Sequence, residues 1–237
     1  MIECVSETGS TNADLLARLE AGEQISEGTW LVAERQNAGR GRQGRAWFDG
    51  YGNFMGSTVV HLAKGETAPQ SLALVASLAL YDAVLSLLPE PQSLQLKWPN
   101  DVLLKGAKLS GILMERVRDT IVLGVGVNLA QAPELPDRAT IAIAAAAPPP
   151  TPQAFAKTLA HHLTEELQRW RSYGAEPITR RWLAAAHPEG TPLKVHDGDG
   201  VGLNGTFAGL TEDASLRLRL ADGTTRVIHA GDVMLSE

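Results

Sequence analysis

The chain has 237 residues and a formal net charge of −6 at pH 7, with 44% hydrophobic and 20% charged residues. These values are ordinary for a globular protein, and the length suits one large domain with a small second one. The negative net charge argues against broad binding to nucleic acids or anionic membranes, so any anion-binding site must be local.

The N-terminus has no charged segment followed by an apolar run, so we read no signal peptide there. The single cysteine, Cys4, excludes an intramolecular disulfide and suits a reducing compartment. The longest apolar stretch, 72–88, is interrupted by polar residues and predicts a buried helix rather than a membrane span. We therefore expect a cytoplasmic protein.

Apolar and β-branched stretches predict strands at 2–6, 29–33, 54–62, 94–98, 112–117 and 121–129. The spacing of apolar residues predicts a short helix after Ser10 and a long helix near 69–88. A proline-rich surface connection at 142–152 separates these elements from two more helices, over 155–170 and 178–183. Neighbouring strands mixed with helices in this way predict an α+β fold with a mixed sheet rather than a regular βα repeat.

From Gly190 onward the sequence changes to about five short strands separated by turns. The turns are predicted at Asp197-Gly198, Asn204-Gly205, Asp222-Gly223 and Gly231-Asp232, because Asp-Gly and Asn-Gly pairs favour hairpins. The strand spacing predicts a small β-barrel of SH3-like size. We expect a boundary near His187-Pro188, which divides the chain into a larger domain at 1–188 and a small domain at 189–237.

The most informative segment is the run GRGRQGR at 39–45. Its glycines let the backbone approach a ligand closely, and its arginines suit carboxylate and phosphate oxygens. Since clustered positive charges repel, we expect a mobile loop that becomes ordered around an anion. RNA-binding Arg-Gly segments have a similar composition. However, the loop follows a strand that ends near Gln36, and it precedes Trp47, which is suited to lie over an adenine. The rest of the chain is acidic, so the positive charge is confined to this loop. A bound phosphate is therefore the better interpretation.

A second segment has a lysine near the end of the predicted strand 94–98. Alternation puts Lys97 on the face opposite the apolar residues, and Pro99 ends the strand. A lysine mounted beside such a rigid turn is well placed to reach a carboxylate or phosphate, although an isolated lysine is most often simply exposed. Asp101 is a turn residue, a Mg²⁺ ligand or a partner for Lys108, and the sequence does not decide among these.

Three further segments supply small or polar residues. Gly111 is predicted to open a strand and to allow close backbone approach. Gly124 and Gly126, two positions apart, leave one face of a strand without side chains, so that a flat ligand or another backbone can lie against it. Asn128, at the end of that strand, both donates and accepts hydrogen bonds. This pattern lacks the helix-opening glycine and the acidic residue of a dinucleotide-binding fingerprint. Ser10-Thr11-Asn12 are either helix-capping residues or ligand contacts.

Taken together and in this order, these segments resemble the biotin protein ligase family. The resemblance rests on Ser10-Thr11-Asn12, Gln36 with the 39–45 loop and Trp47, Lys97 to Asp101, Lys108 to Gly111, and Gly124 to Asn128. Each segment is modest alone, but the ordered set is specific and, with the small C-terminal β-domain, covers nearly the whole chain. The resemblance implies a catalytic domain like that of the class II synthetases, followed by an SH3-like barrel.

The resemblance also implies that biotin and ATP form biotinyl-5′-AMP, that a lysine of a biotin carboxyl carrier domain then receives the biotin, and that Mg²⁺ is a cofactor. We expect Lys97 and Arg40 to be catalytic. The implied biotin-binding residues are Ser10, Thr11, Asn12, Gln36, Arg40, Gly41, Arg42, Lys97, Gly111 and Gly124. The implied ATP- and adenylate-binding residues are Arg40, Arg42, Trp47, Lys97 and Asn128. The sequence does not indicate which carboxylates hold Mg²⁺.

Two alternatives stay open from the sequence. Lipoate–protein ligases share a related fold and the same adenylate chemistry, and an RNA-binding or adaptor protein would use the Arg-Gly loop and the barrel. The 39–45 loop and the Lys97–Asp101 turn favour biotin, and the acidic composition disfavours RNA. We expect a carrier domain of a biotin-dependent carboxylase as partner, with no nucleic acid and no membrane, and we leave a homodimer open. Because the catalytic domain begins almost at Met1, we expect no helix-turn-helix domain before it and no operator binding.

Overall fold

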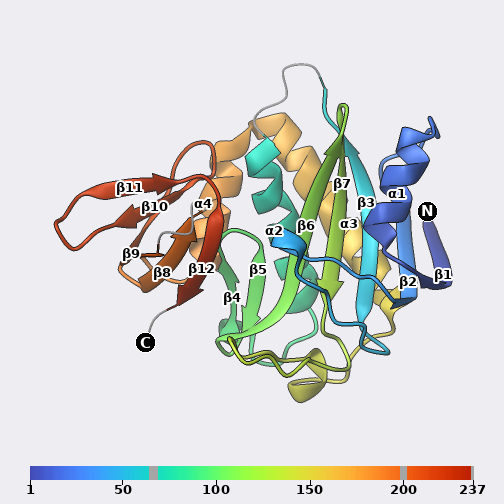
Figure 1. Ribbon diagram of the computed structural model, residues 1–237, viewed down its shortest axis with the longest axis horizontal. Coiled ribbons are helices and arrows are strands. Elements are labelled where there is room, and N and C mark those ends of the chain that lie inside the picture. The colour runs from blue at the N-terminus through green and yellow to red at the C-terminus, as the bar shows by residue number, and fades with distance from the viewer. Residues whose placement is uncertain (64–68, 198–201, 236–237) are drawn as a thin grey trace.

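The computed structural model describes residues 1–63, 69–197 and 202–235. Its larger part is built on a seven-stranded mixed sheet in the order β1-β2-β3-β7-β6-β5-β4 (Figure 1). The first two strands run parallel and the other neighbouring pairs are antiparallel. The strands are β1 (Ile2–Thr8), β2 (Trp30–Gln36), β3 (Phe54–His61), β4 (Leu94–Lys97), β5 (Asp101–Leu104), β6 (Ala107–Val117) and β7 (Thr120–Val127).

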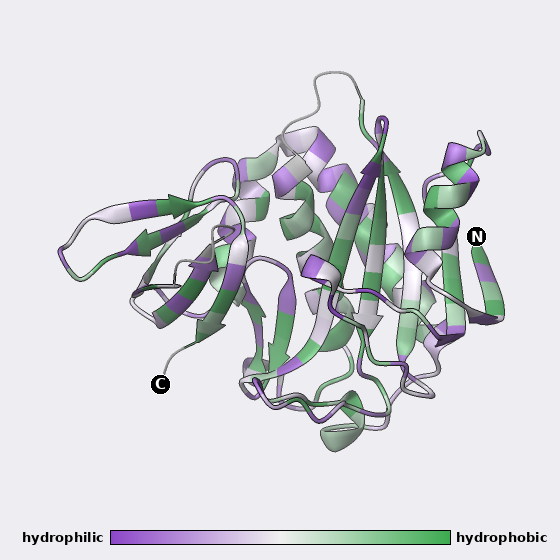
Figure 2. Cartoon of the chain, viewed as in Figure 1, coloured by the Kyte–Doolittle hydropathy of each residue, from purple (hydrophilic) through white to green (hydrophobic). Residues whose placement is uncertain are grey.

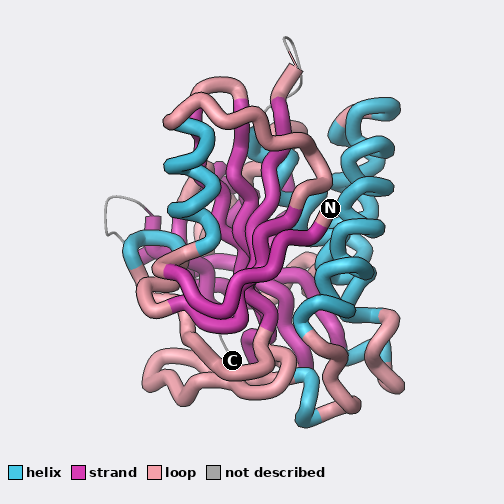
Figure 3. The backbone as a smooth tube through the Cα atoms, turned by 90° about the vertical axis from the view of Figure 1, so that its right-hand side faces the viewer, coloured by secondary structure: helices cyan, strands magenta, loops and turns pink. Residues whose placement is uncertain are grey.

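Helices cover both faces of this sheet, as Figure 3 shows from the side. The short helix α1 (Thr11–Glu20) packs against β3 and β7 on one face. On the other face lie α2 (Pro69–Leu85), α3 (Pro152–Tyr173) and α4 (Ala175–Ala185), which also pack against one another. Helices on both faces of a mixed sheet confirm the predicted α+β class.

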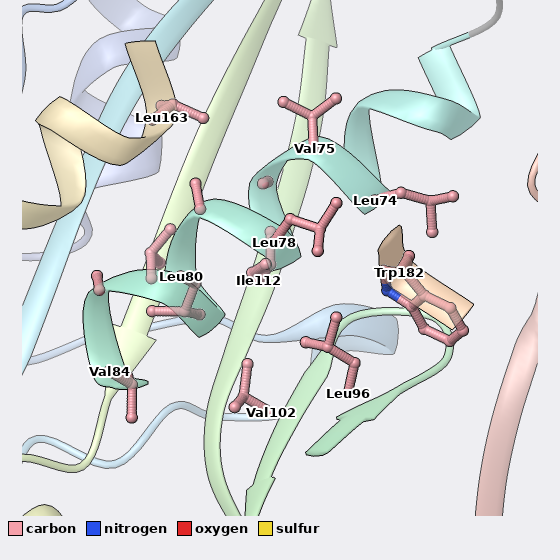
Figure 4. Packing of buried hydrophobic residues seen from close by; sticks show 14 of the residues in the cluster. Leu74, Val75, Leu78, Leu80, Val84, Leu96, Val102, Ile112, Leu163 and Trp182 are labelled. Carbon is pink, nitrogen blue, oxygen red and sulfur yellow. The ribbon is translucent and has the colours of Figure 1, made fainter. Parts of the chain in front are cut away.

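The core is centred on α2, which is apolar around most of its circumference and packs between the sheet and the other two helices (Figures 2 and 4). Two serines interrupt its apolar run, and the hydroxyl of each accepts a hydrogen bond from a tryptophan. Trp182 Nε1 donates to Ser77 Oγ at 3.1 Å, and Trp170 Nε1 donates to Ser71 Oγ at 3.0 Å. In the described part of the chain, no helix is long and apolar enough to cross a membrane.

The C-terminal part is a five-stranded antiparallel sheet in the order β11-β10-β9-β8-β12. Its strands are β8 (Pro192–Asp197), β9 (Gly202–Leu210), β10 (Leu216–Arg219), β11 (Thr225–Ile228) and β12 (Gly231–Leu235). Apolar residues from several of these strands, such as Val195, Phe207 and Leu218, form its buried centre. This small β-domain agrees with the prediction.

The turns between these strands were predicted less well. Asp222-Gly223 does lie between β10 and β11, where Gly223 has a φ of +83° and Asp222 Oδ1 accepts from the amide of Thr224 at 2.9 Å. Asn204-Gly205 instead lies inside β9, where a Cβ on Gly205 would come within 2.4 Å of the Arg219 carbonyl oxygen. This glycine therefore permits close strand packing rather than a turn.

The remaining turn predictions and strand limits also need correction. Gly231-Asp232 begins β12 rather than forming a turn. Asp197-Gly198 extends outside the described residues. The strand β5 was not predicted, and Gly111 lies in the middle of β6 rather than at its start, because β6 already begins at Ala107.

The C-terminal domain packs against the end of β4. Trp98 Nε1 donates to the Ala214 carbonyl at 3.0 Å, and Leu96 forms a parallel bridge to Ala186 just after α4. His187 is buried at this junction, with its ring 4.5 Å from that of Phe207 in an edge-on arrangement. These contacts place the last strand, β12, beside Lys97.

Candidate active site

A cavity of about 510 Å³ lies where the ends of β4 and β6, the glycines of β7 and the 39–45 loop meet the start of β12. Every residue predicted to bind biotin or ATP lines this one cavity: Ser10, Thr11, Asn12, Gln36, Arg40, Gly41, Arg42, Trp47, Lys97, Gly111, Gly124 and Asn128. The lining also includes residues that the sequence did not single out, among them Ser57, Arg138 and Asp232. The fold thus brings segments that are far apart in the sequence to one site.

One end of the cavity is uncharged and rich in hydrogen-bonding groups. Thr11 donates to Gln36 Oε1 both from its amide, at 2.7 Å, and from its hydroxyl, at 3.0 Å. The Ser57 hydroxyl lies 2.7 Å from that of Thr11 and donates to Asn12 Oδ1 at 2.6 Å. Ser10 occupies the N-cap position of α1, but its side chain makes no capping hydrogen bond. Such a network of donors and acceptors suits a neutral polar ring system.

The bare face that the two glycines of β7 create is covered by side chains of the same chain. A Cβ on Gly124 would lie 2.3 Å from Asn12 Oδ1. A Cβ on Gly126 would lie 2.2 Å from Trp47 Cε2. Gly111, which pairs with Gly126 in the sheet, also faces the Trp47 ring. The glycines therefore make room for Asn12 and for the Trp47 indole, which forms a flat wall of the cavity.

Asn128 and Trp47 bring unused hydrogen-bonding atoms to the same region. Asn128 Nδ2 donates to the Ile141 carbonyl at 3.2 Å, whereas its Oδ1 is buried without a partner among the described residues. Trp47 Nε1 is likewise buried without a partner in that part of the chain. Buried polar atoms are normally hydrogen-bonded, so the hydrogen bonding of this wall is incomplete among the described residues.

The centre of the cavity is a buried cluster of two lysines around one carboxylate. Lys97 Nζ lies 3.0 Å from Asp101 Oδ2, and Lys108 Nζ donates to Asp101 Oδ1 at 2.6 Å. Burial acts to raise the pKa of Asp101, but the two ammonium groups outweigh it and hold the pKa below its usual value. Of the three roles left open for Asp101, the structure shows the partnership with Lys108, and the cluster keeps a net positive charge for a bound anion.

The three arginines of the 39–45 loop make different contacts. Arg42 is the most enclosed and donates to Asn100 Oδ1 at 3.1 Å and to the Gly231 carbonyl at 3.2 Å, and burial lowers its pKa. Arg45 pairs with Asp232 of β12 at 2.5 Å. Arg40 lies apart from them, 45% exposed and 3.4 Å from Glu115, the carboxylate that also accepts from Asn12 Nδ2. Arg42 and Arg45 thus line the charged part, and Arg40 covers the uncharged end.

The start of β12 completes the site. The Val233 carbonyl accepts a hydrogen bond from Lys97 Nζ at 2.9 Å, in addition to the contacts of Gly231 and Asp232 with the arginines. Burial opposes the charge of Asp232, but Arg45 keeps its pKa below the usual value. This contribution was not predicted, because only folding brings β12 to a lysine more than a hundred residues away in the sequence.

The cavity carboxylates are all paired with cations of the chain. Asp101 is engaged by two lysines, Asp232 by Arg45 and Asp137 by Arg138. Within the described ranges, no group of three or more His, Cys, Asp or Glu side chains is arranged to hold a metal ion. Mg²⁺ usually keeps several waters and binds through one or two carboxylates together with substrate phosphates.

Comparisons with known proteins agree with this geometry. The model of the biotin/lipoate A/B protein ligase family matches residues 4–130. The chain is 36% identical over 245 residues to a biotin–[acetyl-CoA-carboxylase] ligase of Paracoccus denitrificans, with 97% of this chain and 98% of that protein covered. It is 36% identical over 237 residues to a ligase of the same name from Mycobacterium tuberculosis, covering 98% of this chain and 88% of that one.

A solved structure shows the same fold. The biotin protein ligase from Aquifex aeolicus, in complex with biotin and ATP, superposes with a TM-score of 0.82 and covers 99% of both chains, at 24% sequence identity. The fold, the cavity and the full-length relatives lead to one conclusion. The chain belongs to the biotin/lipoate A/B protein ligase family.

Proposed function

We propose that this chain is a biotin protein ligase, which forms biotinyl-5′-AMP from biotin and ATP and then transfers biotin to a lysine of an acceptor protein. The observation that carries the proposal is a single cavity whose uncharged hydrogen-bonding end, at Thr11 and Gln36, adjoins a buried basic centre at Lys97 and Arg42. The full-length relatives, both named biotin–[acetyl-CoA-carboxylase] ligases, support biotin over lipoate.

The uncharged end suits the head group of biotin. Its ureido ring offers two N–H donors and a carbonyl acceptor, and the network of Thr11, Ser57, Asn12 and Gln36 supplies complementary atoms. The Trp47 wall and the unpartnered Asn128 Oδ1 suit the adenine, whose exocyclic amine is a donor. Biotin and nucleotide would then lie end to end along the cavity, with the biotin carboxylate and the α-phosphate meeting at the centre.

In the first step, a carboxylate oxygen of biotin attacks the α-phosphorus of ATP. The bond between the α-phosphorus and the oxygen that bridges to the β-phosphate breaks, and pyrophosphate leaves with the electron pair. Two anionic groups must approach each other, so the residues contribute mainly positioning and charge stabilisation. The Lys97 ammonium is held by Asp101 and the Val233 carbonyl, which fixes it where both the carboxylate and the α-phosphate would contact it.

In the second step, the amine of an acceptor lysine attacks the carbonyl carbon of the mixed anhydride. The bond from this carbon to the phosphate oxygen breaks, AMP leaves, and the amine proton passes to solvent. Arg40 and Arg42 would hold the adenylate between the two steps and exclude water, which would otherwise hydrolyse it. We propose a biotin carboxyl carrier domain of acetyl-CoA carboxylase as the acceptor, since both relatives are named for that substrate.

Magnesium and location complete the proposal. Because the cavity carboxylates are already paired, Mg²⁺ would be bound mainly through the phosphates of ATP, as is common for this ion. A cytoplasmic location is supported by the free thiol of the single cysteine, Cys4, which is exposed on β1.

The activity is tested by measuring pyrophosphate release after adding ATP with biotin, with lipoate or with neither. Release with biotin, followed by labelling of a carrier domain, is the expected result. Release only with lipoate would move the chain to lipoate–protein ligase chemistry, and release with neither would overturn the proposal. An acceptor whose target lysine is replaced by arginine is the control for the transfer step.

A further inference from the structure

Arg138 brings to the cavity a cation that lies outside all the motifs of the sequence. It lies in the segment between β7 and α3, lines the cavity, and is 22% exposed. Its Nε donates to Asp137 Oδ2 at 2.9 Å, and a second guanidinium nitrogen contacts the same oxygen. The rest of the guanidinium is free to bind a ligand, because an arginine has five N–H donors.

The backbone around Arg138 is held on both sides. The Lys108 amide donates to the Ala139 carbonyl at 2.9 Å, and the Ile141 amide donates to the Lys108 carbonyl at 3.0 Å. Thr140 thereby forms a parallel bridge with Lys108 at the start of β6. Arg138 is thus mounted next to an ordered bridge, which limits the conformational freedom that its side chain would lose on binding an anion.

The register of β6 and β7 gives the position of Arg138 relative to the reacting groups. Asn12, at the biotin end of the cavity, covers Gly124 in the middle of β7, whereas Asn128 directly follows the C-terminal end of that strand. Lys108 and the bridge to Thr140 lie beside the C-terminal end of β7, since the Asn128 amide donates to the Leu109 carbonyl at 3.0 Å. Arg138 therefore lies at the end of the cavity away from the biotin pocket.

In a phosphoryl transfer the attacking and leaving oxygens lie roughly in line. If biotin enters from the Asn12 end and the α-phosphate contacts Lys97, the leaving pyrophosphate points away from Asn12. On that side, two arginines of the chain are each paired with a carboxylate. Asp137 pairs with Arg138, and Asp232 pairs with Arg45.

The charges of these two pairs act on one another. The pKa of Arg138 is raised mainly by its hydrogen bond to Asp137, and the charges of Asp232 and Asp101 add to this effect. The pKa of Asp137 is lowered mainly by Arg138, with a contribution from Arg45. Both arginines line the same cavity, and each is paired with a carboxylate of the chain.

We propose that Arg138, together with Arg45, binds the β- and γ-phosphates of ATP and the pyrophosphate formed from them, in place of the Asp137 carboxylate. This inference rests on the proposed function, because it assigns a part of the ATP substrate of that reaction. It gives Arg138 a role in the first step and none in the second, since pyrophosphate has left before the acceptor lysine reacts.

Arg138→Gln separates the two steps. We expect the KM for ATP to rise and product inhibition by pyrophosphate to weaken, each by about tenfold, the size of one charge-assisted hydrogen bond. Transfer of biotin from preformed biotinyl-5′-AMP to the carrier domain should stay at the parental rate. Arg116→Gln, at an exposed position near the end of β6, is the matched control and should leave all three quantities unchanged.

Asp137→Asn distinguishes phosphate binding from a purely structural ion pair. It removes the anion that competes with phosphate, so the KM for ATP should fall or stay at the parental value. If Arg138 only anchors its loop through Asp137, both variants would raise the KM alike, and the assignment would be wrong.

The parent enzyme serves as the reference for both proposals. A parent that forms no biotinyl-5′-AMP would overturn the proposed function. With an active parent, the assignment of Arg138 alone fails if Arg138→Gln keeps KM and pyrophosphate inhibition within about twofold of the parent, well below the effect of one such hydrogen bond. It also fails if only KM changes, or if the transfer step slows equally.

Discussion

Lys97 is held by two parts of the chain that are distant in the sequence. Asp101, four residues away, neutralises part of its charge, and the Val233 carbonyl of β12 accepts a second hydrogen bond from its three N–H donors. Its orientation is therefore set before any ligand arrives, which is the condition under which a charged donor stabilises a transition state best.

Lys97→Ala should slow single-turnover formation of the adenylate by at least about 100-fold, as for the loss of one preorganised donor. Biotin affinity should change far less, because Thr11 and Gln36 lie at the other end of the cavity. Rapid-quench kinetics and titration calorimetry measure the two effects. Lys157→Ala, on the exposed side of α3, is the control. Equal losses in rate and affinity would show that the role assigned to Lys97 is wrong.

Gly126 tests the Trp47 wall directly. A Cβ at Gly126 would come within 2.2 Å of the indole, so Gly126→Ala must displace the ring. We expect a red shift of tryptophan fluorescence as Trp47 becomes exposed, together with a raised KM for ATP. Gly106→Ala, in the open turn between β5 and β6, is a glycine control with free space around its Cβ, although its φ of +77° gives it some strain. An unshifted spectrum in Gly126→Ala would argue against the observed position of Trp47.

At the scale of elements, the 39–45 loop connects the two ends of the site. Arg40 reaches Glu115 beside the uncharged end, while Arg42 and Arg45 reach β12 beside the charged end. A ligand that lies along the cavity would therefore be covered by one continuous segment. The expected mobility of this loop in the free protein stays a prediction.

Arg40→Gly should leave biotin affinity within about threefold of the parent but speed dissociation of the adenylate by about tenfold, the effect of one lost charged contact. Release of labelled adenylate into a trap measures this rate. Arg118→Gly is a suitable control, because Arg118 lies in an exposed turn at a φ of 52°, which glycine adopts readily. If the variant retains adenylate as tightly as the parent, the loop is not a lid.

The residues that could be predicted from the sequence are those concentrated in short segments. The 39–45 loop and the Lys97–Asp101 turn each carry several unusual residues close together, so their chemistry is visible locally. Arg138 and Asp232 are ordinary residues within their own segments, and only the tertiary fold brings them to the cavity. For the same reason Asn204-Gly205 was taken for a turn, since the approach of β10 that requires this glycine is not encoded nearby.

At the scale of the whole molecule, the junction between the two sheets is sensitive to pH. Burial lowers the pKa of His187 below its ordinary value, because it disfavours the charged ring in the folded protein. Below about pH 6.5, the usual pKa of histidine, the unfolded chain binds a proton that the folded chain does not. The free energy of unfolding is therefore fully retained above that pH and falls as the pH drops towards the folded pKa.

His187→Phe should remove this dependence, which amounts to at most about 1.4 kcal/mol per pH unit in that window. Urea unfolding of the variant and the parent at several pH values between 5 and 8 measures the slope. His161→Phe, at an exposed position of α3, should keep the parental slope. Identical slopes in His187→Phe and the parent would rule out His187 as the titrating group.

The hydrogen bond from Lys97 to β12 has a consequence for biosynthesis. β12 is the last of the described strands to leave the ribosome, so a nascent chain carries its arginine loop and its lysine long before their anchor exists. Fragments released before Gly231 would lack the carbonyls that orient Lys97 and Arg42. Such fragments should form the biotinyl adenylate poorly. Incomplete chains would therefore release little of this reactive anhydride, which acylates lysines of other proteins.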